Sequence, residues 1–194
     1  MALLAETLVE EWLNRQGFLT VRGVRDGVNE MDVLAVRLGA SGGSVQEAWH
    51  VEVQSSFRPM NYLTSLPKPL QQETGKGAGS AFQRTPEMIE ECVKAWIEKK
   101  YRKDKMVKHR DFFCPRAEWK PVLVHAVVKH EKELEEFRRQ GVEIIPLQRI
   151  LEELCPPKRP DFTASSGTDI ADLIDYYGRE RELPIVDEVE EEDE

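Results

Sequence analysis

Two short apolar runs, each interrupted by one acidic residue, constrain the fold of this chain more than any other feature. Residues 29–36 read NEMDVLAV and residues 50–55 read HVEVQS, which places Asp32 and Glu52 inside runs of alternating side chains. Alternation of this kind predicts β-strands. Acidic residues are depleted in strands because a lone buried carboxylate is costly. Both acids could lie at solvated strand ends, but apolar residues continue beyond each of them and favour a functional role.

The two predicted strands place oxygen-bearing side chains on one face of a sheet. Side chains two residues apart project from the same face of a strand, so Glu52 and Gln54 share a face. If the strands pair, Asp32 can meet them there. Two carboxylates and an amide are hard oxygen ligands of the kind that divalent cations prefer. The pattern therefore predicts a site for a divalent cation.

A predicted helix and a first strand precede these two runs. Residues 2–16 carry apolar side chains at helical spacing. Three of them form one stripe: Leu4, Leu8 and Trp12. Gly17 follows as a natural helix-ending residue, and residues 18–21 predict a strand. A third acid, Glu6, lies in the first turns of this helix.

This order of elements, with its acids, resembles a known group of enzymes. An acid-bearing helix, a Gly-Phe pair, a strand, a strand with Asp and a strand with Glu-x-Gln follow one another here. The chain is similar in this respect to the PD-(D/E)XK nuclease superfamily, also called restriction-endonuclease-like. Ala5-Glu6 and Gly17-Phe18 match the opening helix of its Holliday-junction-resolvase and Mrr-like branch. The resemblance covers roughly residues 2–62.

The resemblance implies a divalent-metal-dependent nuclease that hydrolyses phosphodiester bonds, with DNA as the substrate. Asp32 and Glu52 would hold Mg²⁺ or Mn²⁺, with the main-chain carbonyl of Val53 as a third ligand. Glu6 would act through a water or a second metal, and Gln54 would position the attacking water. The metal would polarise the phosphate and lower the pKa of that water.

Two residues depart from the family pattern. Met31 replaces the motif proline, and Gln54 replaces the motif lysine. A neutral amide cannot stabilise hydroxide as an ammonium does. In an active enzyme, either the metal must supply more of that stabilisation, or a lysine from the following loop, Lys68 or Lys76, must replace the missing ammonium. The same departure leaves a second function open: a catalytically inactive nuclease-like module that binds nucleic acid or protein.

The remaining sequence predicts an α/β domain. Residues 57–84 form a connection rich in proline and glycine without a regular pattern, and connections of this length are often functional. Thr85-Pro86-Glu87 is a clear helix start, and apolar spacing carries that helix to residue 101. The later elements are a strand at 121–128, a helix at 131–140, a strand at 142–145 and a helix at 146–154. The whole order predicts a mixed central sheet flanked by helices, with an α-β-β-β-α-β core.

Charge is unevenly distributed along the chain, whose net charge is −9. Residues 161–194 hold 13 acidic residues and two arginines, whereas residues 1–160 carry a net charge of +2. A nearly neutral body with a basic segment at 86–120 is compatible with phosphate contacts. Six basic side chains are the predicted nucleic-acid contacts: Arg58, Lys68, Lys76, Arg84, Lys99 and Lys103.

The sequence divides into three parts. Residues 1–155 predict the nuclease-like domain, residues 156–187 a linker with one amphipathic helix, and residues 188–194 a disordered acidic tail. No apolar run is long enough for a membrane span, and no secretory signal is evident. Three widely spaced cysteines favour reduced thiols, so a cytoplasmic location is expected. DNA is the expected partner, a homodimer stays open, and the tail is expected to contact a basic partner or the protein's own basic surface.

Overall fold

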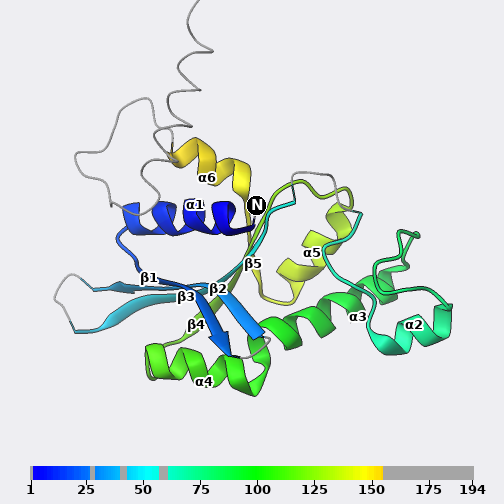
Figure 1. Ribbon diagram of the computed structural model, residues 1–194, viewed down its shortest axis with the longest axis horizontal. Helices are drawn as coiled ribbons and strands as arrows, with labels where there is room; N and C mark the ends of the chain where they lie inside the picture. Colours follow the sequence, from blue (N-terminus) through cyan, green and yellow to red (C-terminus); the bar gives the residue numbers. More distant parts are fainter. Residues whose placement is uncertain (1, 27–28, 40–42, 57–60, 155–194) are drawn as a thin grey trace, which may run out of the picture.

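A computed structural model of the chain describes residues 2–26, 29–39, 43–56 and 61–154 (Figure 1). The predicted linker, the amphipathic helix and the acidic tail lie outside these residues, and so does Arg58.

The centre of the molecule is a five-stranded sheet in the order β1-β2-β3-β4-β5. The first three strands form an antiparallel meander, while β4 and β5 run parallel to β3. The sheet is therefore mixed, as predicted, and the α/β fold class is confirmed. The strand bounds are β1 (Leu19–Asp26), β2 (Asn29–Leu38), β3 (Val45–Gln54), β4 (Trp119–His125) and β5 (Glu143–Pro146).

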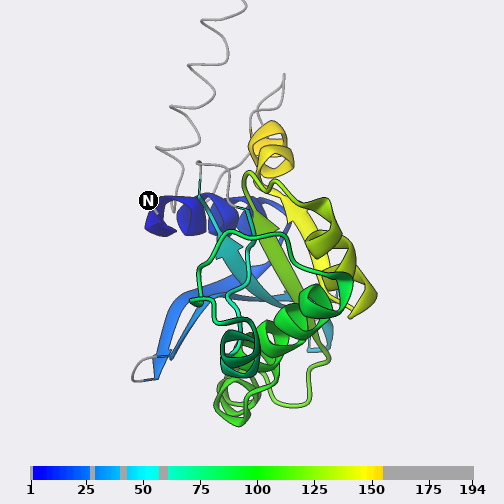
Figure 2. The same ribbon diagram turned by 90° about the vertical axis from the view of Figure 1, so that its right-hand side faces the viewer.

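Helices cover both faces of the sheet. The helical elements are α1 (Ala2–Arg15), α2 (Lys68–Thr74), α3 (Pro86–Ile97), η1 (Glu98–Arg102), α4 (Asp104–Phe113), α5 (Glu131–Arg139) and α6 (Leu147–Leu154). Figures 1 and 2 show α1 and α6 on one side of the sheet and α3 with α4 on the other. Figure 1 also shows α2 extending away from the sheet, beyond α3.

Alternation along the strands supplies a core on each face. Val33, Val51 and Val122 are buried with the apolar residues of α1 and α6. Leu34 is buried with Met106 of α4 on the other face. Because β2 and β3 have apolar side chains on both faces in their central parts, a carboxylate there, such as that of Glu52, also lies in the interior.

The connection after β3 contains a short helix, α2, where no regular element was predicted. Pro67 occupies its N-cap, and Gly75 closes it with a left-handed φ of 65°. Proline at the start and glycine just past the end are the usual signals of a helix. Both were present in the sequence, but the surrounding prolines and glycines concealed them.

The single helix predicted from residue 85 to residue 101 changes character near its end. The α-helical part ends at Ile97, and Glu98–Arg102 continues as a π-helical turn. This turn is fixed to the sheet because Tyr101 is buried and donates a hydrogen bond to the carbonyl oxygen of Val122 over 2.6 Å. A π-helical turn is wider than an α-helical one, so it changes the direction of the residues that follow. Such turns occur frequently at functional sites.

Candidate functional site

The pairing of β2 with β3 brings the two predicted acids together. Val33 lies opposite Val51 in the antiparallel ladder, and continuing that register by one residue places Asp32 level with Glu52. The Oδ2 atom of Asp32 accepts a hydrogen bond from the backbone N–H of Val53 over 2.7 Å. The predicted pairing of these two strands is therefore confirmed, and its register places the two acids on adjacent strands.

Glu52 lies between two partners that fix both of its oxygens. Its side chain is fully buried. His50 Nε2 lies 3.1 Å from Oε1, and the ammonium of Lys100 forms an ion pair with Oε2. Burial, together with the positive charges of Arg110 and Lys100, lowers the pKa of His50 to about 3. The ring is therefore neutral, and we assign Nε2 as the donor to the carboxylate.

The acids at this site raise one another's pKa values. Burial, and then the charge of Glu52, raises the pKa of Asp32 to about 7. Burial also raises the pKa of Glu52 to about 7, although Lys100 opposes the shift. Glu6, from α1, has a pKa raised by burial and by Asp32. Glu30 at the start of β2 adds to the repulsion felt by each of them. Four carboxyl groups from α1, β2 and β3 thus lie close enough to repel one another electrostatically: those of Glu6, Glu30, Asp32 and Glu52.

Lys100 is the positive partner of this cluster. It lies in the π-helical turn η1, and its side chain is 22 % exposed. Burial alone lowers the pKa of the ammonium, but the carboxylates of Glu52, Asp32 and Glu30 outweigh it and raise the pKa. Lys100 therefore stays charged beside Glu52. Sequence reasoning missed this residue, because it was counted only as one of many basic residues in the segment at 86–120.

The donor atoms suit a hard cation, although the ligand set is small. Among the described residues, no group of three or more His, Cys, Asp or Glu side chains could hold a metal ion. The predicted set contains only two such side chains, Asp32 and Glu52, and is completed by a main-chain oxygen. Carboxyl groups with pKa values raised to about 7 by burial are ones that a nearby cation would stabilise in the ionised form. In the chemistry of their oxygen atoms, the two carboxylates are therefore ligands of the type that a divalent metal accepts.

Gln54 ends β3 at the edge of this site. It lies beside His125 in the parallel ladder, and its carbonyl oxygen accepts a hydrogen bond from Ala126 N over 3.0 Å. The side chain is partly exposed. The two loop lysines that could have replaced the missing motif lysine, Lys68 and Lys76, are both exposed. The ammonium that the structure places in the site is that of Lys100 instead.

One predicted nucleic-acid contact has a different role in the structure. Arg84 is only 6 % exposed. Its Nη1 and Nη2 atoms donate to Oγ1 and the carbonyl oxygen of Thr64 over 3.0 and 2.9 Å, and Nη1 lies 3.9 Å from a carboxylate oxygen of Glu133. The prediction for Arg84 must be corrected, because its guanidinium is enclosed by protein groups and cannot lie along an exposed phosphate backbone.

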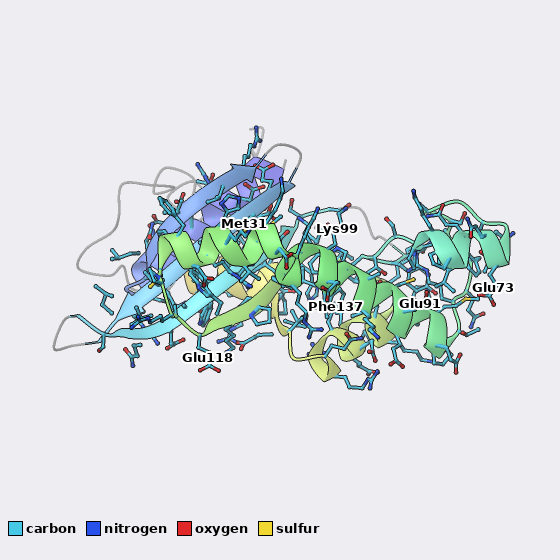
Figure 3. All side chains as sticks on the ribbon, turned by 90° about the horizontal axis from the view of Figure 1, so that it is seen from below. Met31, Glu73, Glu91, Lys99, Glu118 and Phe137 are labelled. Atoms are coloured by element: carbon cyan, nitrogen blue, oxygen red, sulfur yellow. The ribbon has the colours of Figure 1, made fainter. Side chains whose placement is uncertain are left out.

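The other described basic candidates lie on the surface. Lys68, Lys76, Lys99 and Lys103 are exposed. Figure 3 looks onto the face that carries α3 and α4, with Lys99 near the junction of the two helices. Farther along α3, a hollow is bordered by four acids and one lysine: Glu87, Glu90, Glu91, Glu98 and Lys94. This part of α3 is therefore acidic, whereas the exposed Lys99 and Lys103 lie in η1 and just before α4.

Comparison with known proteins assigns no family to the chain. No protein-family model matches the sequence, and no curated protein matches it. A solved structure described as a protein of unknown function, AF1548, is similar over 88 % of this chain and 65 % of its own, with 14 % identity and a TM-score of 0.43. This chain thus spans just under two thirds of that protein. Within the described residues, no helix has both the length and the apolar character needed to cross a membrane.

Proposed function

We propose that this protein is a divalent-metal-dependent nuclease that hydrolyses phosphodiester bonds. The observation that carries the proposal is the convergence of Asp32 and Glu52 across β2 and β3, with the Lys100 ammonium against Glu52. Paired carboxylates with raised pKa values beside a retained cation are typical of a site built for chemistry rather than for stability. DNA as the substrate rests on the resemblance in the motif residues.

Asp32 and Glu52 are the residues that would hold Mg²⁺ or Mn²⁺, with the carbonyl of Val53. When bound, the metal polarises the phosphate and lowers the pKa of the attacking water. Asp32 is oriented by the N–H of Val53, and Glu52 is oriented by His50. These hydrogen bonds hold the two carboxylates in place, which reduces the reorganisation needed for the reaction.

Lys100 supplies the positive charge that Gln54 lacks. An ammonium next to the metal-binding carboxylate can stabilise hydroxide or the charge that develops on the phosphate. Gln54, at the end of the same strand as Glu52, is left to orient the water through its amide. Burial and the nearby Asp32 carboxylate raise the pKa of Glu6. Glu6 can therefore accept a proton from a water in the site.

The same ion pair favours a second candidate function. Lys100 already neutralises Glu52 in the protein itself, so the site does not need a metal to balance this charge. A nuclease-like module that has lost its chemistry and binds nucleic acid or protein would have such an arrangement. Exposed lysines near η1 serve either function. A cytoplasmic location is expected for both candidates, because widely spaced cysteines favour reduced thiols.

A cleavage assay separates the two functions. Linear, single-stranded and branched DNA would be incubated with the protein in Mn²⁺ and, in parallel, in EDTA. We expect Mn²⁺-dependent cleavage by the wild type and none by Asp32→Asn or Glu52→Gln, both of which preserve the size of the side chain. Cleavage that persists in either variant would rule out the proposed mechanism. Absence of cleavage on every substrate would favour the binding module.

A further inference from the structure

A hollow of about 550 Å³ lies next to the candidate site, beyond the C-terminal ends of β3 and β4. Its volume is in the range of small-ligand sites. Three segments line it: the chain that follows β3, the residues before α3, and the turn that opens α5. Its lining includes Tyr62, Gln83, Arg84, Lys129, His130 and Lys132.

Two stacked aromatic rings, those of Tyr62 and His130, line this hollow, and hydrogen bonds and packing fix the orientation of Tyr62. The rings of Tyr62 and His130 are stacked, with their centroids 4.8 Å apart and their planes 18° apart. The guanidinium of Arg84 lies 4.0 Å from the centroid of the Tyr62 ring. The phenol oxygen of Tyr62 also accepts a hydrogen bond from the backbone N–H of Arg84 over 3.0 Å. Because Arg84 is itself fixed by Thr64 and Glu133, the tyrosine cannot easily change its orientation.

His130 presents a stacking surface to solvent. Its side chain is exposed, and only one face of the ring is used by Tyr62. The hydrogen-bonding groups around it are mixed, because Gln83 and Lys132 can donate and Glu131 and Glu135 can accept. A flat ring with donors and acceptors on its edge is the ligand that these groups suit.

The hollow is also close to the proposed reaction centre. Ala126 is hydrogen-bonded to Gln54, two residues from Glu52. His130 is four positions after Ala126 in the chain, and a segment of that length spans at most about 14 Å. A nucleic-acid strand whose phosphate lies at Glu52 can therefore reach the hollow with a nucleotide a few positions along the strand.

We propose that this hollow receives an unpaired nucleobase from the strand being cleaved, stacked on the outer face of His130. The inference deepens the proposed function and rests on it. Stacking of this kind requires a base that is free of its partner, so the preferred substrate is single-stranded or branched nucleic acid rather than a continuous duplex. The lysines at the rim, Lys129 and Lys132, contact the phosphates on either side of that base.

The first test compares affinities without cleavage, using fluorescein-labelled DNA in EDTA. The wild type should bind a single strand more tightly than the fully paired duplex of the same sequence. His130→Ala should weaken binding of the single strand about 5- to 150-fold, the range that base–aromatic stacking provides, and leave duplex binding unchanged. His130→Phe keeps a flat ring and should retain the affinity. The matched control is Val127→Ala, an exposed residue of the same turn that does not line the hollow.

The second test changes the DNA and begins with the wild-type protein. Single strands with one abasic nucleotide, moved along the sequence, should bind the wild type more weakly when the abasic position occupies the hollow. Binding by His130→Ala should not weaken when the abasic nucleotide is at that position. The variant removes the ring and the abasic nucleotide removes the base, so both changes remove the same stacking contact.

Equal wild-type affinity for the single strand and the duplex would overturn the inference. It would also be overturned by a His130→Ala loss of the same size on both forms, or by no binding to either. The proposed nuclease is judged separately by Mn²⁺-dependent cleavage and its loss in Asp32→Asn. If cleavage is absent while the His130 effect is observed, the base-binding site is supported and the nuclease function is ruled out. If cleavage is present without a His130 effect, only the base-binding site is ruled out.

Discussion

Glu52 shows how one buried carboxylate is maintained in this fold. Its side chain has no exposure, and its two oxygens contact a neutral histidine and an ammonium. Removing one partner of a buried ion pair typically costs about 3–5 kcal/mol, because the other charge is left unpaired. Such an arrangement contributes little to stability compared with an apolar pair of the same volume. Its presence in the centre of the sheet is therefore best explained by function.

At Asp32 the raised pKa predicts a pH-dependent stability. In the unfolded chain this carboxyl loses its proton near pH 4, whereas in the folded protein it keeps the proton to about pH 7. Its contribution to the free energy of unfolding therefore falls as pH rises through this window, and the full penalty is present above pH 7. Asp32→Asn should raise the unfolding free energy by about 1–4 kcal/mol at pH 8 and little at pH 4.

Urea denaturation at the two pH values, in EDTA, measures this difference. The asparagine oxygen can still accept the hydrogen bond from Val53, so the local structure should persist. A stabilisation of equal size at pH 4 and pH 8 would show that the carboxylate is not destabilised by burial.

Lys100 and Gln54 offer a second test at the residue scale. Lys100→Met should reduce cleavage by about 100- to 1,000-fold, the typical cost of losing one group that stabilises charge in the transition state. Adding Gln54→Lys to that variant should restore part of the rate, since it returns an ammonium to the end of β3. The control is Arg102→Met, which removes an exposed positive charge from the same turn. Unchanged kcat in Lys100→Met would remove this residue from the mechanism.

The acids of the site could be predicted from the sequence, but the lysine could not. Alternation along residues 29–36 and 50–55 is a local property, and it fixed which strand face Glu52 occupies. Asp32 followed from pairing of the two strands, and Glu6 followed from the resemblance. Lys100 lies in a π-helical turn, and nothing in the spacing of side chains distinguishes that turn from the α-helix before it. Its proximity to Glu52 depends on a contact between residues far apart in the chain.

At the scale of elements, the buried cluster around Arg84 connects three segments. Glu133 of α5 accepts hydrogen bonds from the backbone N–H groups of Leu63 and Thr64, over 2.5 and 3.0 Å, and lies near the guanidinium of Arg84. The cluster thus joins the loop after β3 to α5 and to the start of α3. Neither residue was predicted to be buried, because a charged side chain in a sequence indicates a surface position unless its partner is known.

Arg84→Ala should therefore act on folding, not on phosphate contacts. We expect the unfolding free energy to fall by about 3 kcal/mol, because Glu133 is left buried without its cation. Arg139→Ala is the matched control, since Arg139 pairs with Glu136 and Glu90 on the exposed side of α5 and should change stability little. Chemical denaturation measures both. Equal, small effects would mean that Arg84 is not part of a structural cluster.

For the whole molecule, the segregated charge predicts a regulatory effect of the C-terminal part on binding. Removing residues 161–194 changes the net charge from −9 to +2. Attraction to phosphates should increase, and the gain should be large at low salt and vanish at high salt. The measurement is the affinity for DNA across a salt series, with a neutral tail of equal length as the control. An affinity that does not change at low salt would show that the tail does not screen the basic surface.

The most direct test of the account is a calorimetric titration of Mn²⁺ into the protein. A nuclease whose two carboxylates hold the metal should bind Mn²⁺ at neutral pH and release protons as it binds, because the pKa values of Asp32 and Glu52 lie at about 7. Asp32→Asn and Glu52→Gln should each abolish that heat, while Lys99→Met should leave it unchanged. Wild-type protein that binds no Mn²⁺, or variants that bind it as the wild type does, would contradict the proposed site.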